Sequence, residues 1–126
     1  MAQHFTTNGL IFAKFNFSHN GTSPDALEEF VDLEAFGQNN FSKQIFDLDQ
    51  VITFLQEKCT FTQSLQLRYH LIGHSMGGGV SILYAYHFPE KIQQLITWAA
   101  IGVAKTPWGK WTEERMRQWQ LDGAQL

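Results

Sequence analysis

Residues 69–80 read Tyr-His-Leu-Ile-Gly-His-Ser-Met-Gly-Gly-Gly-Val, an apolar run that ends in a glycine-rich turn around Ser75. The first part has the length and composition of a buried β-strand. From Gly77 to Phe88, apolar residues recur at helical spacing, and Pro89 stops the pattern. This stretch therefore predicts a strand, a sharp turn at Ser75 and a helix.

The turn has the spacing that a serine nucleophile requires. A serine hydroxyl reacts poorly unless it is presented at an exposed tip, activated by a base and paired with oxyanion donors. Gly73 and Gly77 lie two residues before and two residues after Ser75, where closely packed strand and helix backbones favour small residues. The pattern predicts a nucleophile elbow framed by Gly73, His74 and Gly77.

A glycine-rich turn between a strand and a helix can instead bind phosphate. The known phosphate-binding patterns are G-x-G-x-x-G and G-x-x-x-x-G-K-[ST]. Residues 73–79 have neither spacing and contain no lysine. The sequence therefore favours a nucleophile over a phosphate-binding loop.

The rest of the chain alternates strand-like and helix-like segments, which is typical of an α/β fold with a mostly parallel sheet. The apolar run over 92–100 is typical of a strand buried on both faces. Residues 25–40 are left unassigned, because the segment 37–40 (Gly-Gln-Asn-Asn) interrupts any long helix. We predict strands over 10–17, 65–72 and 92–100, and helices over 42–58, 77–88 and 113–121.

The run Gly-His-Ser-Met-Gly-Gly at residues 73–78 resembles the nucleophile elbow of α/β-hydrolases, in a form common among esterases and acyl hydrolases. Residues 10–23 resemble the strand and loop before the elbow, and residues 97–100 resemble the strand after it. The resemblance implies a partial α/β-hydrolase sheet with flanking helices. It also implies hydrolysis of an ester, thioester or amide through an acyl-enzyme, with Ser75 as nucleophile and the Met76 N–H as an oxyanion donor.

The sequence departs from this family where the base and the acid should lie. The family order is serine, acid, histidine, and the one histidine after Ser75 is His87. At about 1.5 Å per residue along a helix, His87 lies roughly 18 Å from Ser75, too far for a base. His74 and His70 are expected to pack locally, whereas His19 lies in a loop that could border the active site and is a candidate for substrate contact.

The family takes its second oxyanion donor from a His-Gly loop that is expected upstream of Met1. We therefore expect residues 1–126 to form a single, incomplete α/β-hydrolase domain, with a cap or lid insertion beginning over about 103–126. The exposed sheet edge of an incomplete sheet is open to pairing, which favours a homo-oligomer.

Composition excludes several classes of function. The formal net charge is -3, and Lys and Arg are scattered singly, so no nucleic-acid footprint is present. No stretch approaches the ~20 apolar residues of a membrane span. No secretory signal is visible and there is a single cysteine, which favours the cytoplasm. We assign no metal and no cofactor, and expect a small-molecule acyl substrate.

Two further interpretations remain open. One is a non-catalytic remnant that keeps part of the sheet and binds a partner or ligand. The other keeps the fold and changes the chemistry, as in a peptidase or a cofactor-free haloperoxidase, because fold alone does not determine function.

Overall fold

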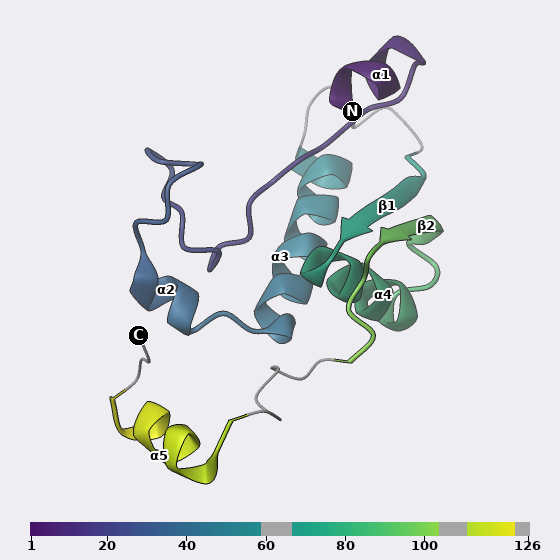
Figure 1. The fold of residues 1–126 in the computed structure, drawn as a ribbon. Coiled ribbons are helices and arrows are strands. Elements are labelled where there is room, and N and C mark those ends of the chain that lie inside the picture. The colour runs from purple at the N-terminus through teal and green to yellow at the C-terminus, as the bar shows by residue number, and fades with distance from the viewer. Residues whose placement is uncertain (59–66, 104–110, 123–126) are drawn as a thin grey trace.

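The computed structural model describes residues 1–58, 67–103 and 111–122 (Figure 1). Its centre is a β-strand, helix, β-strand unit, and the other elements lie around this unit or apart from it. The elements in chain order are α1 (Ala2–Thr7), α2 (Leu33–Gly37), α3 (Phe41–Thr53), the single π-helical turn η1 (Phe54–Lys58), β1 (Tyr69–His74), α4 (Met76–His87), β2 (Ile92–Trp98) and α5 (Glu113–Asp122).

The strands β1 and β2 form a parallel sheet, which confirms the predicted α/β class and parallel pairing. Helix α4 is the crossover between them, as parallel strands require. In the register of the pair, Leu71 lies opposite Leu95 and Ile72 opposite Ile96, while His74 at the end of β1 lies opposite Trp98. The carboxyl ends of both strands therefore meet at the turn that carries Ser75.

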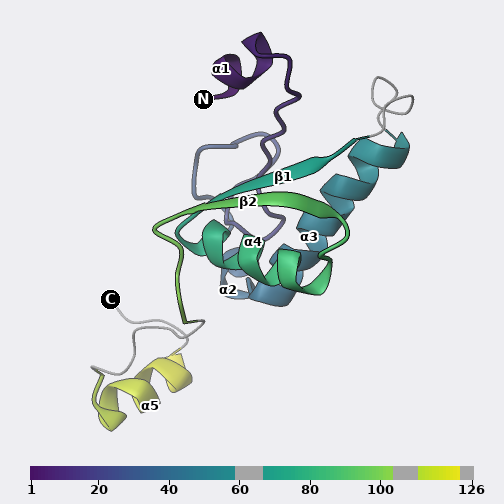
Figure 2. The same cartoon turned by 90° about the vertical axis from the view of Figure 1, so that its right-hand side faces the viewer.

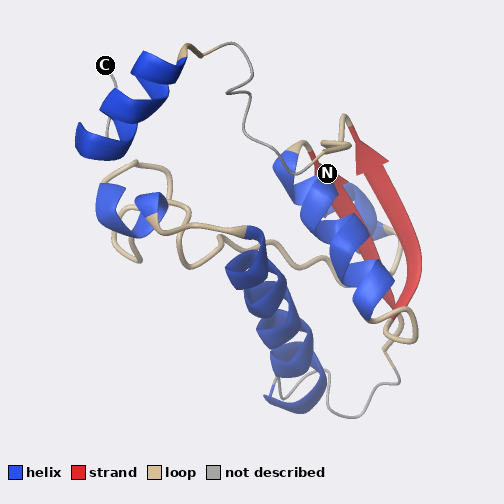
Figure 3. Ribbon diagram, turned by 90° about the horizontal axis from the view of Figure 1, so that it is seen from below, coloured by secondary structure: helices blue, strands red, loops and turns tan. Residues whose placement is uncertain are grey.

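One face of the sheet is covered by α4, with α3 packed beside that helix (Figures 2 and 3). The buried core lies between these two helices and the strands. Its fully buried members come from α3 and α4, and partly buried side chains of both strands pack against them. The buried apolar side chains are those of Leu48, Ile52, Val80 and Tyr84.

The other face of the sheet is open within the described residues. Ile72, Ile96 and Trp98 keep 42%, 55% and 72% of their surfaces exposed. The prediction that residues 92–100 form a strand buried on both faces is therefore wrong. The apolar run is present, but no described element covers its outer side. Parallel sheets are normally covered on both faces, so this side is open to further packing.

Helix α3 begins where the side chain of Asn40 accepts a hydrogen bond from the Lys43 N–H at 3.0 Å. This is the usual role of an N-cap asparagine. The predicted helix over 42–58 is confirmed as far as Thr53, and its last five residues form the π turn η1. Gln44, Leu48 and Ile52 follow one another at four-residue spacing on α3 and form its buried stripe.

The predicted strand over 10–17 is wrong. This segment is an irregular stretch with no strand partner among the described residues (Figure 1). Its aromatic side chains pack instead of forming a ladder: Phe12 stacks on Phe5, while Phe15 and Phe17 meet edge to face and pack against the core. An apolar run provides burial, but a strand also needs a neighbour for its backbone hydrogen bonds.

The predicted helix over 113–121 is confirmed as α5, which lies apart from the β1–β2 unit (Figures 1 and 2). Residues 104–110 and 123–126 of the expected cap segment lie outside the described residues. The cap assignment stays a prediction. The unassigned segment 25–40 contains α2, which begins with the Asp32 side chain accepting from the Ala35 N–H at 2.9 Å.

Candidate active site

Ser75 lies at the turn between β1 and α4, in a backbone conformation that L-residues rarely adopt. Its φ is 52° and its ψ is −120°. A non-glycine residue held in such a conformation stores on the order of 1–3 kcal/mol of strain, and strain of this kind clusters at functional sites. The side chain is exposed. The turn therefore presents Ser75 at its tip, which is the presentation that a nucleophile elbow needs.

Three backbone hydrogen bonds hold the turn in place. The Ser75 N–H donates to the carbonyl oxygen of Trp98 at 3.0 Å. The Ser75 carbonyl oxygen accepts from the N–H groups of Gly79 at 3.2 Å and Ile101 at 3.3 Å. The strained residue is thus bound to its own helix and to the chain that leaves β2, which keeps its conformation fixed.

Position 73 requires a glycine because the neighbouring backbone leaves no space for a Cβ atom. A Cβ at this position would lie 2.6 Å from the carbonyl oxygen of Gly77 and 2.7 Å from the Cα of Gly78. Backbone atoms cannot move aside as a flexible side-chain end can. The close approach of strand and helix predicted for Gly73 is therefore confirmed.

The prediction that close packing also requires a small residue at Gly77 is wrong. A Cβ there would meet nothing within 4 Å. A Cβ atom would instead clash at the next two residues. On Gly78 it would lie 2.6 Å from the Cβ of Ala100, and on Gly79 it would lie 2.7 Å from Ile101 Cγ1. These two glycines therefore allow α4 to pack closely against the chain that leaves β2.

Met76 is the first residue of α4, and its N–H has no acceptor within the helix. This N–H follows Ser75 and lies at the positive end of the helix dipole, where negative charge is stabilised. The Met76 sulfur accepts a hydrogen bond from Nε2 of Gln44 at 3.3 Å. Sequence reasoning missed Gln44, although its place in the buried stripe of α3, four residues before Leu48, was a visible signal.

His74 adjoins Ser75, but its ring packs against a residue of the neighbouring strand β2. The rings of His74 and Trp98 meet edge to face with their centres 6.0 Å apart. Both side chains are exposed. This is the local packing expected for His74.

His19 lies half-buried in the loop before α2 and is tied to α3. Its Nδ1 lies 2.7 Å from Ser18 Oγ, and its Nε2 lies 3.0 Å from Lys43 Nζ. Because Ser18 Oγ donates to Asp47 at 2.9 Å, His19 Nδ1 must be the donor to Ser18 and Nε2 the acceptor from Lys43. These bonds anchor the loop on α3, and substrate contact by His19 stays a prediction.

The described residues bring no base to Ser75. Its hydrogen bonds within these residues are made by its backbone atoms. His87 is the last residue of α4, at the opposite end of the helix from Ser75, where its ring packs against Tyr86 and Phe88. The arrangement therefore presents the exposed Ser75 side chain beside one backbone N–H that has no acceptor within its helix.

Comparison with known proteins agrees with this geometry. The family model of the alpha/beta hydrolase fold matches residues 15–126. This chain belongs to the α/β-hydrolase fold family. The uncharacterized proteins Rv2715 and MT2788 of Mycobacterium tuberculosis and Mb2734 of Mycobacterium bovis are each 47% identical to it over 38 residues. That segment is 30% of this chain and 11% of each relative. No solved structure matches the chain significantly.

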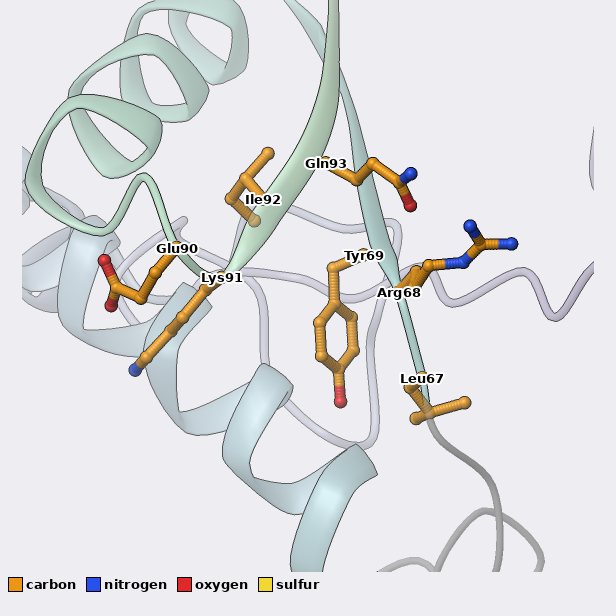
Figure 4. A pocket seen from close by; sticks show the side chains of 7 residues that line it. All are labelled: Leu67, Arg68, Tyr69, Glu90, Lys91, Ile92 and Gln93. Carbon is orange, nitrogen blue, oxygen red and sulfur yellow. The ribbon is translucent and has the colours of Figure 1, made fainter.

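One hollow of this α/β-hydrolase chain is far from the elbow. It has a volume of about 310 Å³ and lies at the amino ends of β1 and β2, where Tyr69 and Ile92 begin the strands (Figure 4). Ligands of open α/β sheets bind at the carboxyl ends of the strands, where Ser75 lies. We therefore do not place the chemistry in this hollow.

The residues near the amino ends of β1 and β2 instead make contacts that stabilise the fold. Asp49 accepts hydrogen bonds from Tyr84 at 2.6 Å and from Lys91 at 2.7 Å. The Lys91 hydrogen bond, more than the Tyr84 one, holds the pKa of the Asp49 carboxyl below its ordinary value. Burial raises the pKa of the Tyr84 hydroxyl, and the bond to Asp49 adds to this shift.

A smaller hollow of about 160 Å³ lies near the elbow. Gly79 and Ile101, both of which bind the Ser75 carbonyl oxygen, contribute to its lining. The other side chains around it are apolar, so it suits an apolar group. It is lined by Phe41, Gly79, Ile82, Leu83, Ile101 and Gly102.

Two other kinds of site are absent from the described part of the chain. Residues 1–58, 67–103 and 111–122 contain no group of three His, Cys, Asp or Glu side chains that could hold a metal ion. Among the same residues, no helix has the length and apolar character that a membrane crossing requires.

Proposed function

We propose that this chain carries the nucleophile of a carboxylesterase-like serine hydrolase, which cleaves an ester, thioester or similar acyl bond of a small molecule. The observation that supports the proposal most strongly is the backbone of Ser75, with φ of 52° at an exposed turn that three hydrogen bonds hold in place. A fold maintains such strain where the presented side chain has a task. Membership of the α/β-hydrolase family supports the same chemistry.

In the proposed reaction, Ser75 Oγ attacks the carbonyl carbon of the substrate and loses its proton to a general base. The carbonyl oxygen becomes an oxyanion that accepts a hydrogen bond from the Met76 N–H. The bond to the leaving group breaks, and the leaving group takes up a proton. Water then attacks the acyl-enzyme, which releases the acid and restores the Ser75 hydroxyl.

The base and the acid of this reaction are proposed to come from outside the 126 residues. No described histidine hydrogen-bonds to Ser75, and His87 lies at the far end of α4. We expect the chain alone to hydrolyse p-nitrophenyl esters inefficiently. Rapid turnover by the isolated chain that is lost in Ser75→Ala would show that a base within it had been overlooked.

The deciding variant is Ser75→Ala in a polypeptide that contains these residues and hydrolyses such an ester. We expect kcat/KM to fall about 10³-fold or more, because the nucleophile is lost and only binding and oxyanion stabilisation remain. Ser42→Ala, an exposed serine on α3, is the matched control and should leave the rate unchanged. Activity that survives Ser75→Ala would contradict the proposal.

A second candidate function is a non-catalytic member of the fold that binds a ligand or partner. The observation that favours it is the absence of a base beside Ser75 within the described residues. A polypeptide with intact sequence on both sides of residues 1–126 that binds acyl compounds without cleaving them would favour this candidate.

A further inference from the structure

We propose that Gln44 is a positioning residue for the oxyanion donor of Met76, an inference that rests on the proposed role of Ser75. Gln44 lies in the first turns of α3 and is 3% exposed. Its side chain crosses to the first residue of α4. It thereby links the start of α3 to the N–H group that follows the nucleophile.

Two hydrogen bonds determine the orientation of the Gln44 amide. Its Nε2 donates to Asn39 Oδ1 at 3.0 Å and to the Met76 sulfur at 3.3 Å. A thioether sulfur can accept but cannot donate, so the NH2 group must face Met76. Asn39 precedes the N-cap of α3 and holds the other amide hydrogen. Both donors of Gln44 are therefore used.

The amide oxygen of Gln44 has no partner. Within the described residues, Oε1 is the buried side-chain nitrogen or oxygen atom that lacks a hydrogen bond. An unpaired buried acceptor lowers stability, and an apolar side chain of the same shape would avoid this loss. Stability alone therefore does not account for a glutamine here. Its NH2 group instead links Asn39, just before the N-cap of α3, to Met76 at the start of α4.

The contact restrains the side chain of Met76, whose other surroundings are half open to solvent. Met76 is 46% exposed, and an unbranched thioether chain rotates freely in such surroundings. Its N–H must point at the oxyanion, and donor alignment of this kind controls transition-state stabilisation. By holding the side chain of Met76, Gln44 keeps the first turn of α4 in the geometry that aims this N–H.

The test is Gln44→Met, which keeps the volume and removes the two donors and the unpaired acceptor. We expect the urea midpoint to stay unchanged or rise. In NMR spectra of the 126-residue chain, the amide and ε-methyl signals of Met76 should shift, and the methyl should become more mobile. In the polypeptide with Ser75-dependent turnover, kcat should fall about 10-fold with KM unchanged. Gln50→Met, an exposed site on α3, is the control and should change none of these.

A second variant changes Met76, the other partner of the hydrogen bond with Gln44. Met76→Leu removes the sulfur acceptor at a half-exposed position that does not threaten folding, and it should lower kcat in the same way. The double variant should lose little more than either single variant, because both remove one contact.

Three results would overturn the inference: unchanged Met76 signals in Gln44→Met, a midpoint that falls together with kcat, or additive losses in the double variant. Turnover that survives Ser75→Ala would instead refute the proposed function, and the Met76 signals would still show whether Gln44 holds that residue.

Discussion

In the β1–α4–β2 unit, the carboxyl ends of the two strands differ from their amino ends in how the nearby residues are held. At the carboxyl end, the elbow combines a strained and exposed Ser75 with glycines that have no room for a side chain. At the amino end, Asp49 pairs with Lys91 and with the fully buried Tyr84. The carboxyl end holds Ser75 in an unfavourable backbone conformation. The amino end is stabilised by hydrogen bonds to Asp49 and by the burial of Tyr84.

The difference separates residues that stabilise the fold from the turn that is proposed to carry its function. Strain at a functional turn persists only when the surrounding structure supplies enough stabilisation to hold it. Here that stabilisation comes from the contacts of α4 with α3 and the strands, and Tyr84 belongs to the same helix that begins at Met76. Changes at the carboxyl end should affect geometry and chemistry, whereas changes at the amino end should affect stability alone.

The largest effect on stability is expected from Gly73→Ala. The new methyl group would lie within 2.7 Å of backbone atoms of Gly77 and Gly78, which cannot yield without moving α4. We expect the free energy of unfolding to fall by about 3 kcal/mol or more. Urea denaturation followed by circular dichroism measures this loss.

Gly77→Ala is the matched control for that experiment. The added Cβ meets nothing within 4 Å, and alanine is a better helix former than glycine. Stability should stay equal or rise by up to about 1 kcal/mol. Equal losses in both variants would show that the elbow is not crowded at Gly73, and the contrast drawn between the two ends would fail.

At the amino end, Tyr84→Phe tests the hydrogen bond to Asp49. The hydroxyl of a fully buried ring is lost, while Asp49 keeps its bond to Lys91. We expect unfolding to become easier by about 1–2 kcal/mol, with no change in Ser75-dependent turnover. Tyr86→Phe, at a position that is 79% exposed, should change stability by less than about 0.5 kcal/mol. A loss of turnover in Tyr84→Phe would mean that the two ends are coupled.

How much the sequence could predict also differs between the two ends. The elbow was predictable because its signal is local: glycines at fixed spacing, an apolar run before them and helical spacing after them. The same local signal predicted the strand and the helix around Ser75, whereas the parallel pairing was predicted from the alternation of strand-like and helix-like segments along the chain. The local signal could not show that a Cβ atom would clash at Gly78 and not at Gly77, because the clash depends on the position of Ala100 in space.

The remaining differences come from contacts between distant segments. Residues 10–17 have the composition of a strand, but no neighbour among the described residues provides the backbone hydrogen bonds. Asp49 is distant in sequence from both Tyr84 and Lys91, and the three residues carry no shared motif, so their cluster was not predicted. Gln44 was missed for a similar reason, because its partner Met76 lies in another helix.

The smallest effect is expected from the pH dependence of the Asp49 ion pair. The pKa of Asp49 in the folded chain lies below its ordinary value of 3.8, chiefly because Lys91 donates to the carboxylate. A depressed pKa stabilises the fold above the unfolded-state value, and this stabilisation is lost as the pH falls through the folded-state value. Asp49 should therefore contribute fully at neutral pH, and its contribution should decline as the pH falls below the ordinary value of 3.8.

Asp49→Asn measures this contribution against the parent chain. The two side chains of the pair are 34% and 28% exposed, so solvent screening limits the difference at pH 7 to about 1 kcal/mol. The difference should shrink as the pH is lowered from 4 to 2 in urea titrations at each pH. Asp25→Asn, at an exposed position, should show no such trend. A difference that stays constant with pH would mean that the Asp49 carboxylate does not gain from Lys91, and the amino end would then owe its stability to packing around Tyr84.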